Sequence, residues 1–132
     1  MPRHVHLYIE EPELNLFPTA QCALLNFAVE EAFANKKADR ELSLMIATHS
    51  PYIANYINVL LRKSRLGEKG LHEEDFDVYL LVDGEARRLI GEDQYTGESV
   101  VDISPLTEAM KNISREYISL ERRNECIHHR FE

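Results

Sequence analysis

The chain has 132 residues, 44% of them hydrophobic and 29% charged, which is enough for one compact domain and too few for two independent cores. Fifteen Lys and Arg against 23 Asp and Glu give a formal charge of -8, which repels a phosphate backbone and leaves nucleic acid only an indirect partner. No apolar run is long enough to span a bilayer, and no signal-peptide core follows the first residues. We therefore expect a cytoplasmic protein without a membrane span.

The first half of the chain predicts a strand, a helix and a second strand. Residues 4–9 are rich in β-branched and aromatic types and predict a strand. Residues 21–36 carry an apolar stripe at helical spacing, which predicts a helix of about four turns. After a polar connection over residues 36–41, the nearly all-apolar run 42–47 is typical of a buried parallel strand. This order predicts a right-handed crossover between parallel strands.

The second half begins with a Ser-Pro pair at 50–51, which places a capping hydroxyl before a proline suited to the first turn of a helix. Residues 76–82 predict a third strand, the Asp-Gly pair at 83–84 a hairpin turn, and residues 86–90 the returning strand. A polar loop is expected to follow the hairpin. Together these elements predict an α/β fold with a short, mainly parallel sheet, flanking helices, and a C-terminal β-hairpin and helix.

A Ser-Pro pair at 104–105 marks the start of the closing helix. Apolar residues at spacings of three and four define one face of this helix: Leu106, Ala109, Ile113, Tyr117 and Leu120.

Polar side chains end the two predicted parallel strands. Glu10 and Glu11 follow the first strand, and Thr48, His49 and Ser50 follow the second. Since open α/β sheets bind ligands at the carboxyl ends of their strands, we expect the acids and the histidine to converge there. The helix N-terminus at the same edge favours anions. Carboxylates that hold a metal and orient a water, beside donors to phosphate oxygens, are what nucleotide hydrolysis requires.

These segments resemble parts of the ATPase heads of the ABC superfamily, in particular the bacterial branch related to the structural-maintenance-of-chromosomes, RecF and overcoming-lysogenisation-defect proteins. Residues 7–18, LYIEEPELNLFP, resemble the Walker B strand and D-loop, and residues 45–53, MIATHSPYI, resemble the H-loop with its switch histidine. The segment from 76 to 120 resembles the C-terminal end of these heads. The resemblance implies a partial P-loop NTPase fold within a single domain over residues 1–132.

The resemblance also implies a role for each motif residue. Glu10 takes the position of the Walker B acid that holds Mg²⁺ together with a Ser or Thr of the P-loop, Glu11 that of the catalytic glutamate, and His49 that of the γ-phosphate contact. Thr48 and Ser50 lie on the phosphate side of the site. The D-loop, which crosses a dimer interface in the assembled ATPase, runs from Pro12 to Phe17, and its interface residues are Pro12, Glu13, Leu14 and Asn15.

The P-loop itself is missing from this sequence. It needs Gly-x-x-x-x-Gly-Lys-Ser/Thr, because glycines let backbone N–H groups wrap the phosphates while the lysine neutralises them. None of the five glycines precedes such a lysine, and the Ser-Gly-Gly-like signature is absent too. We therefore expect the C-terminal lobe of a head, either an excised fragment or a short gene product. It is inactive alone, needs an N-terminal lobe in cis or in trans, and binds Mg²⁺ and ATP tightly only in the complete head.

The missing P-loop strand has a structural consequence if the family's sheet order holds. That strand normally lies between the strands expected here at 42–47 and 76–82. We expect the slot to close by direct pairing of these strands, or to be filled by a second chain through homodimerisation or strand exchange, because native proteins cover apolar strand edges.

Other readings stay open beside the ATPase half. The chain could be a non-catalytic interaction module that has kept an ATPase-derived surface for a partner. Weaker patterns that suggest metal ligands match no zinc spacing and favour solvated side chains; they comprise His4 with His6, the cluster Cys126, His128 and His129, and the pair Asp75 and Asp77.

Overall fold

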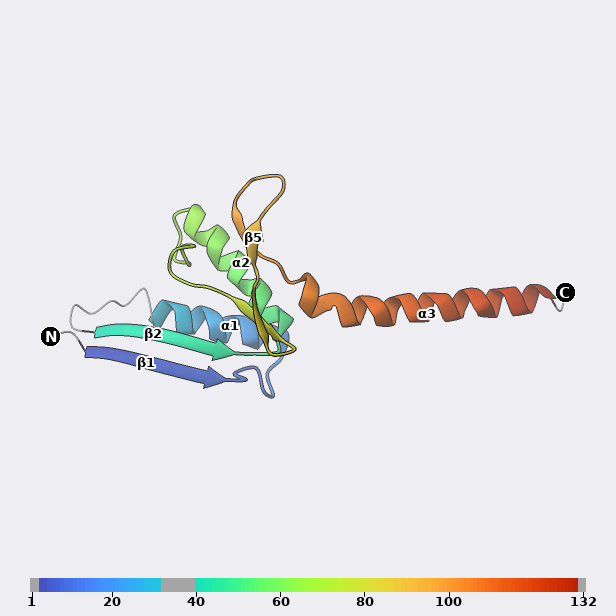
Figure 1. Ribbon diagram of the computed structural model, residues 1–132, viewed down its shortest axis with the longest axis horizontal. Coiled ribbons are helices and arrows are strands. Elements are labelled where there is room, and N and C mark those ends of the chain that lie inside the picture. The colour runs from blue at the N-terminus through green and yellow to red at the C-terminus, as the bar shows by residue number, and fades with distance from the viewer. Residues whose placement is uncertain (1–2, 32–39, 131–132) are drawn as a thin grey trace.

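The computed structural model describes residues 3–31 and 40–130, and it is a mixed α/β structure (Figure 1). Strands β1 (Arg3–Glu10) and β2 (Arg40–Ala47) form a two-stranded parallel sheet, paired in register from one end to the other. The prediction of a short parallel sheet is confirmed. Neither outer edge of this sheet pairs with another strand in the part of the chain that is described.

Helix α1 (Pro18–Val29) connects the two strands and begins three residues before the predicted start. Phe17 keeps extended backbone angles as the N-cap, and Pro18 opens the first turn, where its missing N–H costs no hydrogen bond. The predicted continuation of this helix to residue 36, and most of the polar connection after it, lie outside the described residues.

Helix α2 (Pro51–Arg65) follows β2 directly, and its predicted cap is confirmed. The hydroxyl oxygen of Ser50 accepts a hydrogen bond from the backbone N–H of Ile53 at 3.3 Å. At the other end Gly67 has a φ of 79° and donates its N–H to the carbonyl of Ser64 at 3.1 Å. Glycine adopts this left-handed conformation without strain, so the helix ends cleanly.

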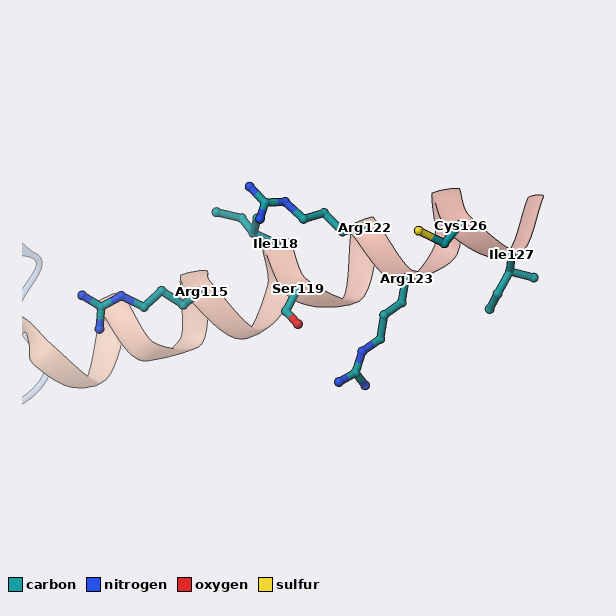
Figure 2. Close-up of a pocket in the computed structure, with 7 residues that line it drawn as sticks. All are labelled: Arg115, Ile118, Ser119, Arg122, Arg123, Cys126 and Ile127. Atoms are coloured by element: carbon teal, nitrogen blue, oxygen red, sulfur yellow. The ribbon is translucent and has the colours of Figure 1, made fainter. Parts of the chain in front are cut away.

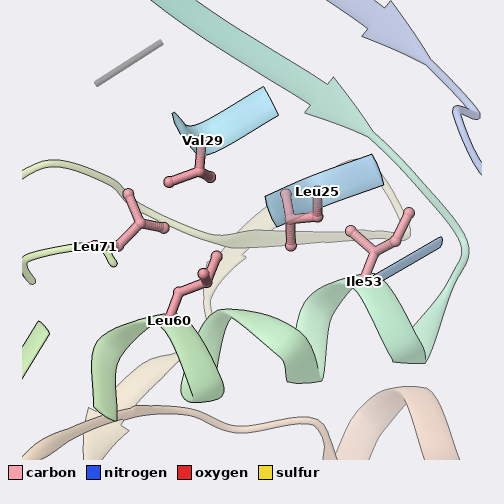
Figure 3. Packing of buried hydrophobic residues seen from close by; sticks show 5 residues of the cluster. All are labelled: Leu25, Val29, Ile53, Leu60 and Leu71. Atoms are coloured by element: carbon pink, nitrogen blue, oxygen red, sulfur yellow. The ribbon is translucent and has the colours of Figure 1, made fainter. Parts of the chain in front are cut away.

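The hydrophobic core lies mainly between α1 and α2. In Figures 1 and 3, α1 is sandwiched between β2 and α2, so both helices lie on one side of the sheet. The centre of the core consists of Leu25, Val29, Ile53, Leu60 and Leu71, with Ile46, Tyr56, Ile57 and Phe76 packed around it.

The third predicted strand is shorter than expected and belongs to a separate sheet. β3 (Tyr79–Val82) pairs in antiparallel fashion with β4 (Glu85–Arg88). The predicted turn is confirmed: Asp83 and Gly84 have φ values of 51° and 78°, as a type I′ hairpin requires.

Of the two expected ways of closing the slot beside β2, direct pairing with residues 76–82 is wrong for the described residues, where β2 pairs with β1 alone. Filling of the slot by a second chain stays a prediction. Phe76 leaves the strand and packs against the core instead. Partial burial of this aromatic ring stabilises the fold.

A second short hairpin was not predicted. β5 (Ile90–Glu92) pairs with β6 (Ser99–Val101) across what was expected to be a polar loop. The side chain of Asn58 holds this hairpin to α2, because its amide oxygen accepts from the Val101 N–H at 2.8 Å and its amide nitrogen donates to the Val101 carbonyl at 3.1 Å.

Helix α3 (Ser104–Arg130) begins where predicted, although its first turn is held by Asp102, whose carboxylate accepts from the Ser104 N–H at 2.9 Å. The helix does not close over the core: it extends away from the body (Figure 1). Within the described ranges, no helix is long and apolar enough to cross a membrane.

Candidate functional site

The carboxyl ends of β1 and β2 meet at one edge of the parallel sheet. The backbone N–H of Glu11 donates to the carbonyl of Ala47 at 2.7 Å, which ties the residue after β1 to the last residue of β2. Glu11 has a φ of 47°, so the chain turns sharply directly after Glu10. A non-glycine residue in this left-handed region is uncommon and is often associated with function.

The expected convergence of the acids and the histidine is confirmed for Glu11 alone. The imidazole Nε2 of His49 lies 3.4 Å from a carboxylate oxygen of Glu11. The His49 side chain is 90% exposed and that of Glu11 41%, so the pair faces open solvent. An exposed pair of this kind contributes little to stability. Its position is therefore not explained by folding energy.

Glu13 joins the predicted D-loop to the switch-histidine segment. One oxygen of its carboxylate accepts a hydrogen bond from the backbone N–H of His49 at 2.9 Å. Burial raises the pKa of Glu13, but this hydrogen bond and the nearby Thr48 hydroxyl outweigh it and hold the pKa below its ordinary value. The second oxygen is buried and has no partner with hydrogen-bond geometry among the described residues, Thr48 included.

A buried polar bridge lies behind this edge. The hydroxyl of Ser50, which caps α2, also donates to the side-chain oxygen of Gln21. The amide nitrogen of Gln21 donates in turn to the carbonyl of Leu16 at 2.9 Å. Gln21 and Ser50 are 8% and 5% exposed, so a polar bridge inside the fold sets the end of the D-loop against the start of α2.

The bridge and the Glu13 contact were missed by reasoning from the sequence. A signal for Gln21 was present, because it lies four residues before Leu25 and eight before Val29, both of which are buried on the inner stripe of α1. A polar residue on such a stripe needs an internal partner. Glu13 carries no comparable signal, since its partner is a backbone N–H.

The remaining predicted residues take simpler positions. Thr48 accepts a hydrogen bond from the Ser50 N–H at 3.0 Å. Pro12 is partly buried, and Leu14 and Asn15 are exposed in the turn, Asn15 with a φ of 62°. Since this turn is exposed and tied to the sheet at Glu11, it is accessible to a partner; its assignment as an interface stays a prediction.

The metal position has one candidate ligand in this chain. Glu10 is exposed, and its side chain makes no hydrogen bond within the described ranges. No group of three or more His, Cys, Asp or Glu side chains is gathered for a metal ion among those residues. One carboxylate does not hold Mg²⁺, which needs several oxygen ligands. The residues present therefore do not form a metal site by themselves.

Two of the weaker metal-ligand patterns have local partners, whereas the third includes His128 and His129, whose side chains lie outside the described residues. His4 lies 2.7 Å from the Glu41 carboxylate across the sheet. The carboxylate of Asp77 accepts from the guanidinium of Arg88 at 2.8 Å, which together with further hydrogen bonds keeps its pKa below the ordinary value. This contact closes the base of the β3–β4 hairpin.

In the comparisons with known proteins, no family model, curated protein or solved structure matches the chain.

Proposed function

We propose that this chain is the half of an ABC-type ATPase head that contains the Walker B strand, the D-loop and the switch histidine, with a partial P-loop NTPase fold. It serves ATP hydrolysis when an N-terminal lobe, in cis or in trans, completes the head. The observation that carries the proposal is the 3.4 Å approach of Glu11 and His49. It occurs at the carboxyl edge of a parallel sheet, where folds of this class bind ligands.

Each of the two side chains can contact one of the reacting groups: Glu11 the attacking water, and His49 an oxygen of the γ-phosphate. The Glu11 carboxylate accepts a hydrogen bond from a water molecule and orients it for attack on the γ-phosphorus, while the bond from that phosphorus to the bridging oxygen of ADP breaks. The N–H of the His49 imidazole donates to a γ-phosphate oxygen. Phosphoryl transfer depends mainly on such positioning and on electrostatic stabilisation.

The open sheet supports the need for a second lobe. Val5 and Leu7 are 45% and 46% exposed on one face of the sheet, and Tyr8 and Met45 are 57% and 66% exposed on the other. Two strands alone are marginally stable in water, and apolar side chains on both faces favour cover by further elements. Strands and helices of an N-terminal lobe would provide that cover.

The catalytic assignment is tested in a head reconstituted with that lobe, which the DNA flanking the gene identifies by a frame encoding Gly-x-x-x-x-Gly-Lys-Ser/Thr. Glu11→Gln should lower steady-state hydrolysis by roughly a hundredfold or more, because a residue that activates water contributes at least that much, while Mg-ATP stays bound. Glu41→Gln, the same change at the amino end of β2, is the matched control and should leave turnover unchanged. Normal turnover in Glu11→Gln would refute the assignment.

The isolated chain provides a second arm. Calorimetric titration with Mg-ATP should detect no tight binding, because the groups that neutralise the phosphates are not in this sequence. Tight binding by the chain alone would contradict the need for a second lobe.

A non-catalytic interaction module is the second candidate, and the exposed apolar side chains along α3 favour it. This function requires that a partner bind equally well with and without nucleotide, and that Glu11→Gln leave that binding unchanged. The same variants therefore separate the two candidates.

A further inference from the structure

Helix α3 carries an apolar row that is uncovered in the described part of the chain beyond its first turns (Figure 1). From Met110 onward, the exposed fractions of the apolar residues of this row run from 54% at Leu120 to 67% at Ile113. Successive members are spaced alternately by four and three residues, and the row consists of Leu106, Met110, Ile113, Tyr117, Leu120, Asn124 and Ile127.

A spacing of four and three averages 3.5 residues, which is the repeat of a coiled-coil seam. A helix of 27 residues is about 40 Å long, and helices of proteins are stabilised chiefly by packing an apolar face. The row therefore indicates that a second helix packs along α3.

We propose that the second helix is α3 of another copy of this chain, running in the opposite direction. In the best alignment Tyr117 faces Leu120 of the second copy, and Met110 faces its Ile127. Each layer of the seam then pairs a residue that follows a spacing of four with a residue of the other copy that follows a spacing of three. The pairing repeats identically on both sides of the two-fold axis, as a closed homodimer requires.

The charged residues beside the row favour the antiparallel direction and the alignment of Tyr117 with Leu120 of the second copy. Tyr117 and Asn124 are seven residues apart and each begins a heptad of the row. Glu116 and Arg123 directly precede them, so both charged side chains lie at the same border of the row. In the antiparallel alignment Glu116 of each copy lies beside Arg123 of the other, so two opposite-charge pairs flank the seam. Moving the antiparallel helices by one heptad in either direction would instead bring Glu116 against its own copy, or Arg123 against its own copy.

A parallel pair has the opposite charge pattern. It would place Glu116 of each copy beside Glu121 of the other, which gives two like-charge contacts. Asn124 would then face its own copy, an arrangement that favours parallel pairs. In the antiparallel alignment Asn124 faces Ile113, one layer from the end of the seam, where solvent can reach its amide. Two attractions in place of two repulsions favour the antiparallel pair.

Figure 2 is consistent with Arg123 lying at the border of the seam. Arg123 and Ile127 extend to one side of α3, whereas Arg122 and Cys126 extend to the other. The residues drawn as sticks line a pocket on the surface of α3 and all belong to this helix: Arg115, Ile118, Ser119, Arg122, Arg123, Cys126 and Ile127.

The first test measures the mass of the full chain in solution by light scattering and sedimentation. A dimer of twice 15.3 kDa is expected, and Leu120→Glu should convert it to monomer. Ile118→Glu is the matched control, since Ile118 is similarly exposed, at 47% against 54%, but lies off the row; it should remain dimeric. Both sites are exposed, so neither change should unfold the body, which circular dichroism will verify.

The second test uses charge reversal to establish direction. In the antiparallel pair, Glu116→Arg and Arg123→Glu should each raise the dimer Kd by roughly tenfold, because two attractions become repulsions. The double variant restores opposite charges and should recover most of the affinity.

Three results would overturn the proposal. The first is a full-length chain that stays monomeric up to its solubility limit. The second is a dimer that survives Leu120→Glu, which would place the contact elsewhere, such as the open sheet edge. The third is a dimer strengthened by Glu116→Arg, which would indicate parallel helices.

Discussion

The buried bridge between the predicted D-loop and α2 allows a quantitative test of how the candidate site is built. Gln21→Leu keeps the side chain's approximate size but removes two hydrogen bonds, the one donated to the Leu16 carbonyl and the one accepted from the Ser50 hydroxyl. Each is worth about 1 kcal/mol of net stability. Leu16 is itself 37% exposed, so its carbonyl can bind water instead.

The Ser50 hydroxyl has no such alternative, because the residue is 5% exposed. Leaving a buried donor unpaired costs about 1–3 kcal/mol, and the better burial of an apolar side chain offsets part of that loss. Gln21→Leu should therefore lower the free energy of unfolding by about 2–3 kcal/mol. Gln94→Leu, at an exposed loop position, is the matched control and should change it by less than about 0.5 kcal/mol.

The assay is urea unfolding followed by far-ultraviolet circular dichroism, since the chain has no tryptophan. A double-mutant cycle with Ser50→Ala isolates the pair, because the lost cap on the Ile53 N–H is common to the single and the double Ser50 variants. In the double variant neither side chain leaves the other unpaired, so it should be more stable than the sum of the single losses predicts, by about 1 kcal/mol. Additive losses, or a Gln21→Leu loss no greater than that of Gln94→Leu, would refute the bridge.

Two further predictions concern single positions. The pKa of Glu13 is lowered in the folded state from its ordinary 4.5. Its carboxylate therefore stabilises the fold above that value, and this contribution is lost as the pH falls through the folded pKa. Glu13→Gln should be less stable than the natural chain at neutral pH, and the difference in the free energy of unfolding should narrow in acid; a difference independent of pH would contradict this role. At Gly70, an added Cβ would lie 2.1 Å from the carbonyl oxygen of Leu60. Gly70→Ala should therefore displace the segment after α2 and lower the free energy of unfolding in urea by about 2–4 kcal/mol. Gly91→Ala is the control: its Cβ would meet nothing within 4 Å, so the loss should be less than half as large.

Most elements were predictable because their signals are local. The Ser-Pro cap before α2, the Asp-Gly turn between β3 and β4, and the apolar runs of β1 and β2 each depend on residues adjacent in the chain. The three-residue strands β5 and β6 were missed because they are too short to show a period. The hairpin partner of β3 was predicted, but the alternative that residues 76–82 also pair with β2 was wrong, because pairing between distant strands depends on which edge is near after the core has formed.

The candidate site divides in the same way. The sequence by itself determined the motif residues Glu11 and His49, and the absence of a phosphate-binding loop, because these are properties of residue type and spacing. Only the tertiary structure brought these two side chains within 3.4 Å, and only it paired Gln21 with Ser50, because contacts between distant segments depend on how α1 and β2 pack. The periodic row of α3 could be recognised from the sequence, but its lack of cover could not: periodicity shows that a face is apolar, whereas its exposure depends on where the rest of the chain lies.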